Sequence, residues 1–191
     1  MSLLNVVHQP SDYQDAIKSK LEALLAYKTE AGDIVPFSVE SYSEFGKSTI
    51  TNPSVFIEVT KAKGTGTKAD RRVYEVLDVA LHSVFPNSMP FAGKLADNSS
   101  FDIREIIILD TPLKKDRLAH WRWELADDSV TRPENVDRMP SVFMNGNEGY
   151  EGWCVSFVQE VTYGKATEED ARESVFFAFN DNADDIKTYQ G

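Results

Sequence analysis

Two runs of alternating apolar and polar residues, separated by a glycine-rich link, constrain the fold more than any other feature of this sequence. The runs cover residues 55–63 and 71–85, and the link between them, residues 64–70, reads GTGTKAD. Because successive side chains of a β-strand point to opposite faces, each run predicts a strand with one apolar face. Two such strands around a polar link predict a long antiparallel β-hairpin. The residues of the apolar face are Val55, Ile57, Val59, Val73, Leu77, Val79, Leu81 and Phe85.

Apolar residues at helical spacing predict an N-terminal helix that packs against this hairpin. Ser11 and Gln14 have the spacing of a capping box, so we expect the helix to start at Ser11 and to end near Lys28. A third alternating run, residues 151–164, predicts a strand antiparallel to the hairpin. These elements predict an α+β fold, in which an antiparallel or mixed sheet is built round the hairpin and helices pack on one face.

The sequence between these elements allows more than one secondary structure. Residues 37–45 fit either an edge strand or an ordered loop, and residues 87–100 fit a loop with a short helix around 91–96. Residues 101–109 fit a strand or, nearly as well, a helix with Ile103, Ile106 and Ile107 facing inward.

Two further segments complete the predicted domain, residues 1–164. Residues 114–128 favour a helix, and residues 129–150, with two prolines, fit an extended loop. Residues 165–191 are expected to form a C-terminal extension, which is strand-like at 174–179 (SVFFAF) and then acidic.

The GKST sequence at residues 46–49 matches the end of a phosphate-binding loop, but its surroundings do not fit one. The position that requires a glycine five residues earlier holds Ser41, and Pro53 follows too soon for the helix that would face the phosphates. Lys47 is therefore expected to be a solvated loop charge, and Asp110, which follows an apolar run, a turn residue.

The other titratable residues do not form a catalytic or metal-binding pattern. His8, His82 and His120 lie in unrelated segments, and Cys154 falls inside a strand pattern, where a small buried side chain is expected. Asp102 and Glu105, like the acidic run at 168–170, fit a solvated face. The sequence therefore predicts a protein that is not an enzyme and has no cofactor and no metal.

The charge of the chain limits its partners. The chain has 31 acidic and 20 basic residues and a formal charge of −11, which disfavours general nucleic-acid binding. Its longest apolar runs are far shorter than a membrane span, so no membrane partner is expected.

The order of these elements resembles that of the tail-terminator family of long-tailed bacteriophages. The resemblance covers about residues 11–164, and it lies in the first hairpin strand at 53–59, the return strand at 73–81 and the closing strand at 155–163. It implies a structural virion protein that forms a ring, expected to be a homohexamer, at the head-proximal end of the tail. Such a ring caps the tail tube, stops its elongation and provides the surface for head–tail joining.

The resemblance also implies partners and an assembly interface. The partners would be the tail tube protein, the sheath in a contractile tail and the head–tail connector, and DNA would pass through without specific binding. The virion would assemble in the cytoplasm of the bacterial host. The residues expected at the interface are Lys61, Lys63, Lys68, Trp123, Phe176, Phe177 and Phe179.

Other classes of function stay open at this point. The chain could be a head-completion protein or another connector or tail-completion protein, or it could be a non-viral α+β binding module. The oligomeric mass distinguishes a ring from a monomeric binding module.

Overall fold

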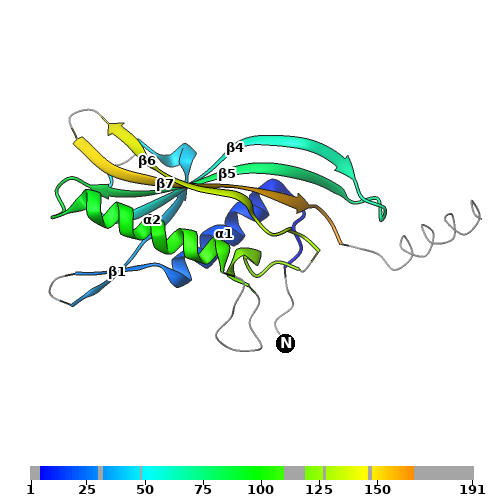
Figure 1. Ribbon diagram of the computed structural model, residues 1–191, viewed down its shortest axis with the longest axis horizontal. Coiled ribbons are helices and arrows are strands. Elements are labelled where there is room, and N and C mark those ends of the chain that lie inside the picture. Colours follow the sequence, from blue (N-terminus) through cyan, green and yellow to red (C-terminus); the bar gives the residue numbers. More distant parts are fainter. Residues whose placement is uncertain are drawn as a thin grey trace, which may run out of the picture.

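The computed structural model describes residues 5–29, 32–47, 49–109, 119–126, 128–145 and 148–165, of which 142–145 and 148 are described by their backbone alone. The fold is α+β, as predicted: two helices pack on one face of a five-stranded mixed sheet, and a separate two-stranded sheet lies beside them (Figure 1).

The large sheet has the strand order β3-β4-β5-β7-β6, and only the β3–β4 pair is parallel. Strands β3 and β6 are therefore the two edges. The bounds of the strands are β3 Ser38–Ser41, β4 Ser54–Thr67, β5 Val73–Pro86, β6 Glu134–Asn145 and β7 Glu148–Thr162. The small sheet pairs β1 (Ala26–Lys28) with β2 (Ile34–Pro36) in antiparallel fashion.

The predicted hairpin is confirmed as β4 and β5. Ile57 lies opposite Leu81 and Val59 lies opposite Val79, so the apolar residues of the two runs share one face. The link is shorter than expected, because β4 continues through the glycine-rich residues to Thr67. The turn itself is closed by a hydrogen bond from the backbone N–H of Lys68 to the carbonyl oxygen of Arg72, 2.9 Å long.

The N-terminal helix α1 runs from Pro10 to Leu24. Its first turn begins earlier than predicted, because the N-cap is Gln9, whose backbone N–H donates to Asp12 Oδ2 over 3.1 Å. The helix also ends earlier than Lys28, because the chain from Ala26 enters β1.

The middle of the chain forms a second long helix, α2, from Ala92 to Ile108. The helical alternative for residues 101–109 is thus confirmed. Ile103 and Ile107 are buried against the sheet, while Ile106 is partly buried. Residues 87–100 were expected to form a loop with a short helix around 91–96, but residues 92–100 all belong to α2, because Ala92, Ala96 and Ser99 continue its buried stripe.

The expectation of an extended loop over residues 129–150 is wrong. Residues 134–145 form β6, which pairs antiparallel with β7. Pro140 was part of the reason for expecting a loop, but an edge strand needs partners on one side only and can accept a proline. Within 114–128, the described residues form only a short 3-10 helix, η2 (His120–Arg122).

The main core lies between the sheet and the two helices. Val55, Leu81 and Val155 from the sheet meet Ile17 of α1 and Ile103 of α2 there, and all five are buried. A smaller apolar cluster lies on the opposite face of the sheet. It contains Ile50, Phe56, Val84 and Tyr150, with Phe45, next to the 3-10 helix η1 (Tyr42–Glu44), packed against it.

Candidate assembly interface

The distal half of the β4–β5 hairpin extends past both helices (Figure 1). Ser54–Ile57 at the start of β4 are buried, whereas residues 60–65 are exposed. At about 3.3 Å per residue the two strands are roughly 45 Å long, so they reach well beyond the core. We call residues 60–74 the arm.

The arm is built from irregular strand pairing. The register shifts between Val59 and Lys61 and again between Lys63 and Gly66, as in β-bulges, which increase the local twist. At Gly66 the ring of Tyr74 lies so close that an added Cβ would meet it at 2.6 Å. The absence of a side chain at Gly66 therefore lets an aromatic ring cover the backbone of the arm.

Ion pairs connect the arm to strands β5 and β7. Lys63 pairs with Asp78 of β5, and Lys68 Nζ lies 2.8 Å from Glu160 Oε1 of β7. The Lys68 ammonium also lies 6.0 Å from the centre of the Tyr74 ring. These contacts hold the arm in one position relative to the sheet.

Arg72 fixes the end of the arm next to the turn. Its Nε lies 2.6 Å from Asp70 Oδ2, and its Nη1 lies 2.7 Å from Asp128 Oδ2. Burial opposes ionisation of Asp70, but the hydrogen bonds and charge of Arg72 outweigh it and hold the pKa of this carboxyl below its usual value. The turn is therefore an ordered structure held by charge-assisted hydrogen bonds.

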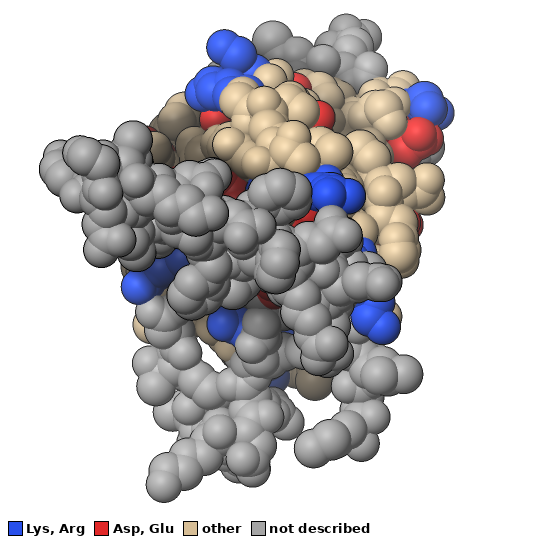
Figure 2. Space-filling model, turned by 90° about the vertical axis from the view of Figure 1, so that its right-hand side faces the viewer, with Lys and Arg blue, Asp and Glu red and all other residues tan. Residues whose placement is uncertain are grey.

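The arm is basic, although the chain as a whole is acidic. Residues 60–74 contain five basic residues and one acidic residue, Asp70. Subtracting these from the totals of 20 and 31 leaves 15 basic and 30 acidic residues in the rest of the chain. Figure 2 shows the end of the molecule to which the arm extends. Lys and Arg side chains, in blue, are visible at several places on this end.

Of the predicted interface residues, the three lysines lie together on the arm. Lys61 is exposed and forms no ion pair with any described residue, whereas Lys63 and Lys68 are already paired within the chain. Trp123 is only 2% exposed, and its indole Nε1 donates to Gln159 in the core. This corrects the expectation that Trp123 lies on a contact surface. Phe176, Phe177 and Phe179 lie outside the described residues.

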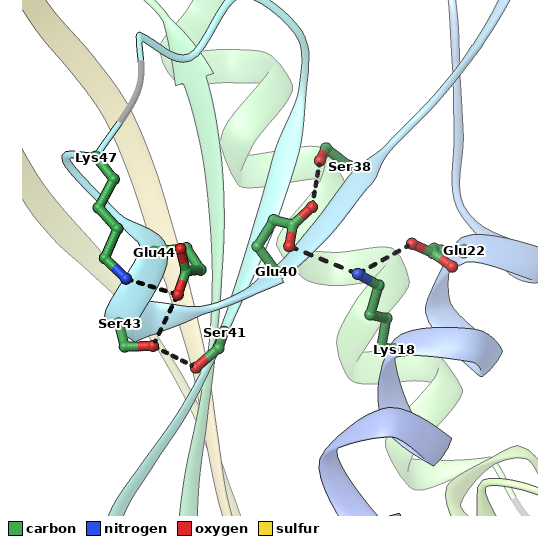
Figure 3. Close-up of polar contacts among 8 residues, drawn as sticks. All are labelled: Lys18, Glu22, Ser38, Glu40, Ser41, Ser43, Glu44 and Lys47. Atoms are coloured by element: carbon green, nitrogen blue, oxygen red, sulfur yellow. Dashed lines mark hydrogen bonds and ion pairs between the residues drawn. The ribbon is translucent and has the colours of Figure 1, made fainter. Parts of the chain in front are cut away.

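The edge strand β3 is surrounded by polar side chains (Figure 3). Lys18 Nζ of α1 lies 3.5 Å from Glu40 Oε2 of β3 and 3.9 Å from Glu22 Oε1. Lys47, the lysine of the GKST sequence, lies 2.8 Å from Glu44 Oε1, so its ammonium has a carboxylate partner within the loop. A short edge strand with charges around it resists pairing with other strands. The longer β6 is the more open edge.

A groove lies between β1 and α2, and sequence reasoning did not find it. Its volume is about 390 Å³, and its wall includes Leu24 and Leu109, which are 40% and 46% exposed. A second hollow of about 530 Å³ shares Tyr27 and Leu95 with it. We call the two together the β1–α2 groove.

Two carboxylates, those of Asp102 and Glu105, line the β1–α2 groove. Partial burial, and then the charge of Glu105, raise the pKa of Asp102. Neither carboxylate forms an ion pair within the described part of the chain. Lys28 also lines the groove but forms no ion pair with either of them. The sequence suggested only a solvated acidic face here, because the apolar wall comes from distant residues.

Two titratable residues lie next to each other on the other face of the sheet, His82 of β5 and Cys154 of β7. His82 Nε2 lies 2.9 Å from Glu58 Oε2, and the neighbouring Cys154 is buried. Burial, with a further contribution from Glu58, raises the pKa of the Cys154 thiol to about 11, so it is protonated at neutral pH. No group of three or more potential metal ligands occurs among the residues that the structure describes.

Comparisons with known proteins give no family assignment: no family model matches the chain, and no curated protein matches it. Neither α1 nor α2 has the length and hydropathy of a membrane-spanning helix, and no other helix of the described residues does.

Proposed function

We propose that this chain is a structural virion protein, the tail terminator of a long-tailed bacteriophage. It forms a closed homo-oligomeric ring, taken to be a hexamer, on the head-proximal end of the tail tube. The ring stops elongation of the tube and provides the surface to which the head–tail connector binds.

The observation that carries this proposal is the basic arm on an acidic body. A protein that repeats one heterologous contact around an axis needs two different complementary surfaces on each subunit. The arm, with five basic residues and one acidic residue, is one such surface. An acidic surface elsewhere on the same subunit is the natural complement, because opposite charges steer association and fix its orientation.

The sheet supports the same proposal. Among the residues that the structure describes, its order leaves β3 and β6 as edges, and the twelve-residue strand β6 pairs there with β7 alone. An exposed edge of this length can accept a strand from another chain. Ring formation would cover surfaces that a monomer leaves exposed.

The net charge of −11 also suits a ring through which DNA passes. Like charges disfavour contacts between the wall and the phosphate backbone, so the DNA does not bind during passage. Purified rings should therefore not be retained on immobilised DNA, even at low salt. Retention that increases as the salt concentration falls would contradict an acidic channel.

The mass of the purified full-length chain, measured by light scattering across a range of concentrations, tests the ring. A mass of six subunits, with ring-shaped particles in negative-stain images, is the expected result. In addition, the purified rings should stop elongation when they are added to growing tail tubes. A chain that stays monomeric at all concentrations and does not affect tube length would overturn the proposal and favour a binding module.

The pairing of the strands shows how to remove most of the arm, residues 64–74. Lys63 lies opposite Val76, so an Asn-Gly turn in place of residues 64–75 would join two positions that already face each other. This variant should keep the core, as judged by circular dichroism, but fail to oligomerise. An unchanged oligomer would show that residues 64–74 of the arm are not a subunit contact.

A further inference from the structure

We propose that the β1–α2 groove receives the arm of a second copy of this chain, and that basic residues of the arm pair there with Asp102 and Glu105. This inference rests on the proposed ring and specifies the acidic half of its repeated contact.

The groove has the chemistry of a binding surface for side chains that are both apolar and positively charged. Leu24 and Leu109 expose 40% and 46% of their surface at it, and Phe91, 74% exposed, lies at its far end. Burying such side chains under a partner is favourable, at roughly 25 cal/mol per Å² of apolar surface. A monomer leaves this surface exposed to water.

The two carboxylates determine the charge of the partner. Asp102 and Glu105 lie three residues apart on α2, where side chains are neighbours and like charges repel. The raised pKa of Asp102 reflects partial burial and the proximity of Glu105. A cation placed between them would relieve this repulsion.

The arm matches both the apolar wall of the groove and its negative charge. Lys61 and Arg71 are exposed and have long aliphatic stems that can cover apolar surface while the charged group reaches a carboxylate. Val73, 47% exposed, adds an apolar side chain at the turn end of the arm, two residues from Arg71. A groove of about 390 Å³ can hold a few such side chains, so the arm would lie across the groove and insert only its side chains.

The chain's own C-terminal segment is a poorer fit. Residues 166–191 contain seven acidic and two basic residues, so their charge would be repelled by Asp102 and Glu105. The arm of the same molecule is excluded by geometry, because it points away from β1, toward the opposite end of the molecule (Figure 1). A second copy is therefore the occupant that the charges and the geometry favour.

Charge reversal and rescue test the inference on the full-length chain. The groove variant D102K/E105K and the arm variant K61E/R71E should each weaken association by at least about tenfold, measured by light scattering over a dilution series. The matched control D15K makes the same change of sign at an exposed site on α1, and its mass should equal that of the wild type. The variant with all four substitutions should recover association, because the charges are exchanged.

The outcomes separate this inference from the proposed ring. If the wild type oligomerises and D102K/E105K does so equally well, the groove is not the contact, although the ring still stands. Failure of the four-substitution variant to recover association, when both parent variants are folded and monomeric, would overturn the direct pairing. A wild type that never oligomerises overturns both proposals.

Discussion

The phenol of Tyr13 donates a 2.6 Å hydrogen bond to Gln159 Oε1, although the two residues are 146 positions apart. Both side chains are buried, Tyr13 in α1 and Gln159 in β7. The same oxygen accepts a 2.9 Å hydrogen bond from the indole Nε1 of Trp123. The amide nitrogen of Gln159 donates in turn to the carbonyl oxygen of Thr131, 2.7 Å away. One buried glutamine thus connects the N-terminal helix, the segment after α2 and the last described strand.

Replacing Gln159 by leucine should destabilise the fold strongly. The variant keeps a similar volume but leaves the Tyr13 hydroxyl and the Trp123 indole without their acceptor, and each unsatisfied buried group costs about 1–3 kcal/mol. We expect the free energy of unfolding to fall by about 3 kcal/mol. Urea denaturation followed by tryptophan fluorescence measures it.

The matched control is Tyr13→Phe, which removes one donor and leaves Gln159 bonded to Trp123. This substitution should lower the free energy of unfolding by about 1 kcal/mol. If Gln159→Leu were no more destabilising than Tyr13→Phe, the cluster would not contribute to stability through its hydrogen bonds.

The sequence could predict the strand that carries Gln159, but not the hydrogen-bond partners of this residue. The alternation in residues 151–164 predicted strand β7 and its apolar face, and Gln159 occupies an inward position of that pattern. A polar residue at an inward position was the available indication of a buried hydrogen bond. Its partners could not be identified, because they depend on how α1 and the segment after α2 pack against the sheet.

The hairpin, the closing strand and the α+β class were predictable because each follows from local alternation. Strand β6 was not, because it is an edge strand whose partner decides its conformation and whose Pro140 favours a loop. The β1–α2 groove was equally hidden, since Leu24 and Leu109 meet there from positions far apart in the chain. The basic arm, in contrast, could be recognised from the charges of residues 60–74 alone.

Stability should fall as the pH rises from about 9 to about 11. The Cys154 thiol ionises near pH 9 when unperturbed, whereas burial and Glu58 raise its pKa in the folded protein to about 11. Above pH 9 the unfolded chain therefore releases a proton that the folded protein retains, and the free energy of unfolding falls by up to about 1.4 kcal/mol per pH unit. Below pH 9 the thiol has no effect. Urea denaturation at pH 8, 9 and 10 measures the slope.

The control for this pH dependence is Cys154→Ala, which removes the titrating group. Burial also raises the pKa of Tyr13, so some loss of stability above pH 10 should remain in the variant. Between pH 9 and 10, however, the variant should lose less stability than the wild type. Parallel curves for the two proteins would show that the thiol titrates alike in both states.

Gly66→Ala should weaken the arm because of Tyr74. The new methyl group would lie 2.6 Å from the tyrosine ring. The ring must therefore move away from the strand, and it loses its present position near Lys68. We expect a loss of about 0.5–1 kcal/mol, since the displaced ring can rotate into solvent. Hydrogen exchange of the arm amides should become faster, whereas that of the β5–β7 core should not change.

A double-mutant cycle isolates the cause of this effect. In the Tyr74→Ala background the methyl group meets no ring, so Gly66→Ala should have no cost or should be slightly stabilising. The same loss in both backgrounds would instead point to the backbone conformation at Gly66.

Arg138 should hold the edge strand β6 to the helical layer. Its Nη1 lies 2.9 Å from Asp97 Oδ1 and donates to Ser100 Oγ over 3.1 Å, and its guanidinium lies 4.8 Å from the centre of the Trp153 ring. Arg138→Ala should lower the free energy of unfolding by about 1–2 kcal/mol and speed hydrogen exchange along β6. Glu134→Ala, at an exposed glutamate at the start of β6, is the matched control and should change stability by less than about 0.5 kcal/mol. Because β6 is an open edge of the sheet, Arg138→Ala should also make the protein more prone to aggregate. Equal exchange rates along β6 in both variants would show that pairing with β7 alone fixes this strand.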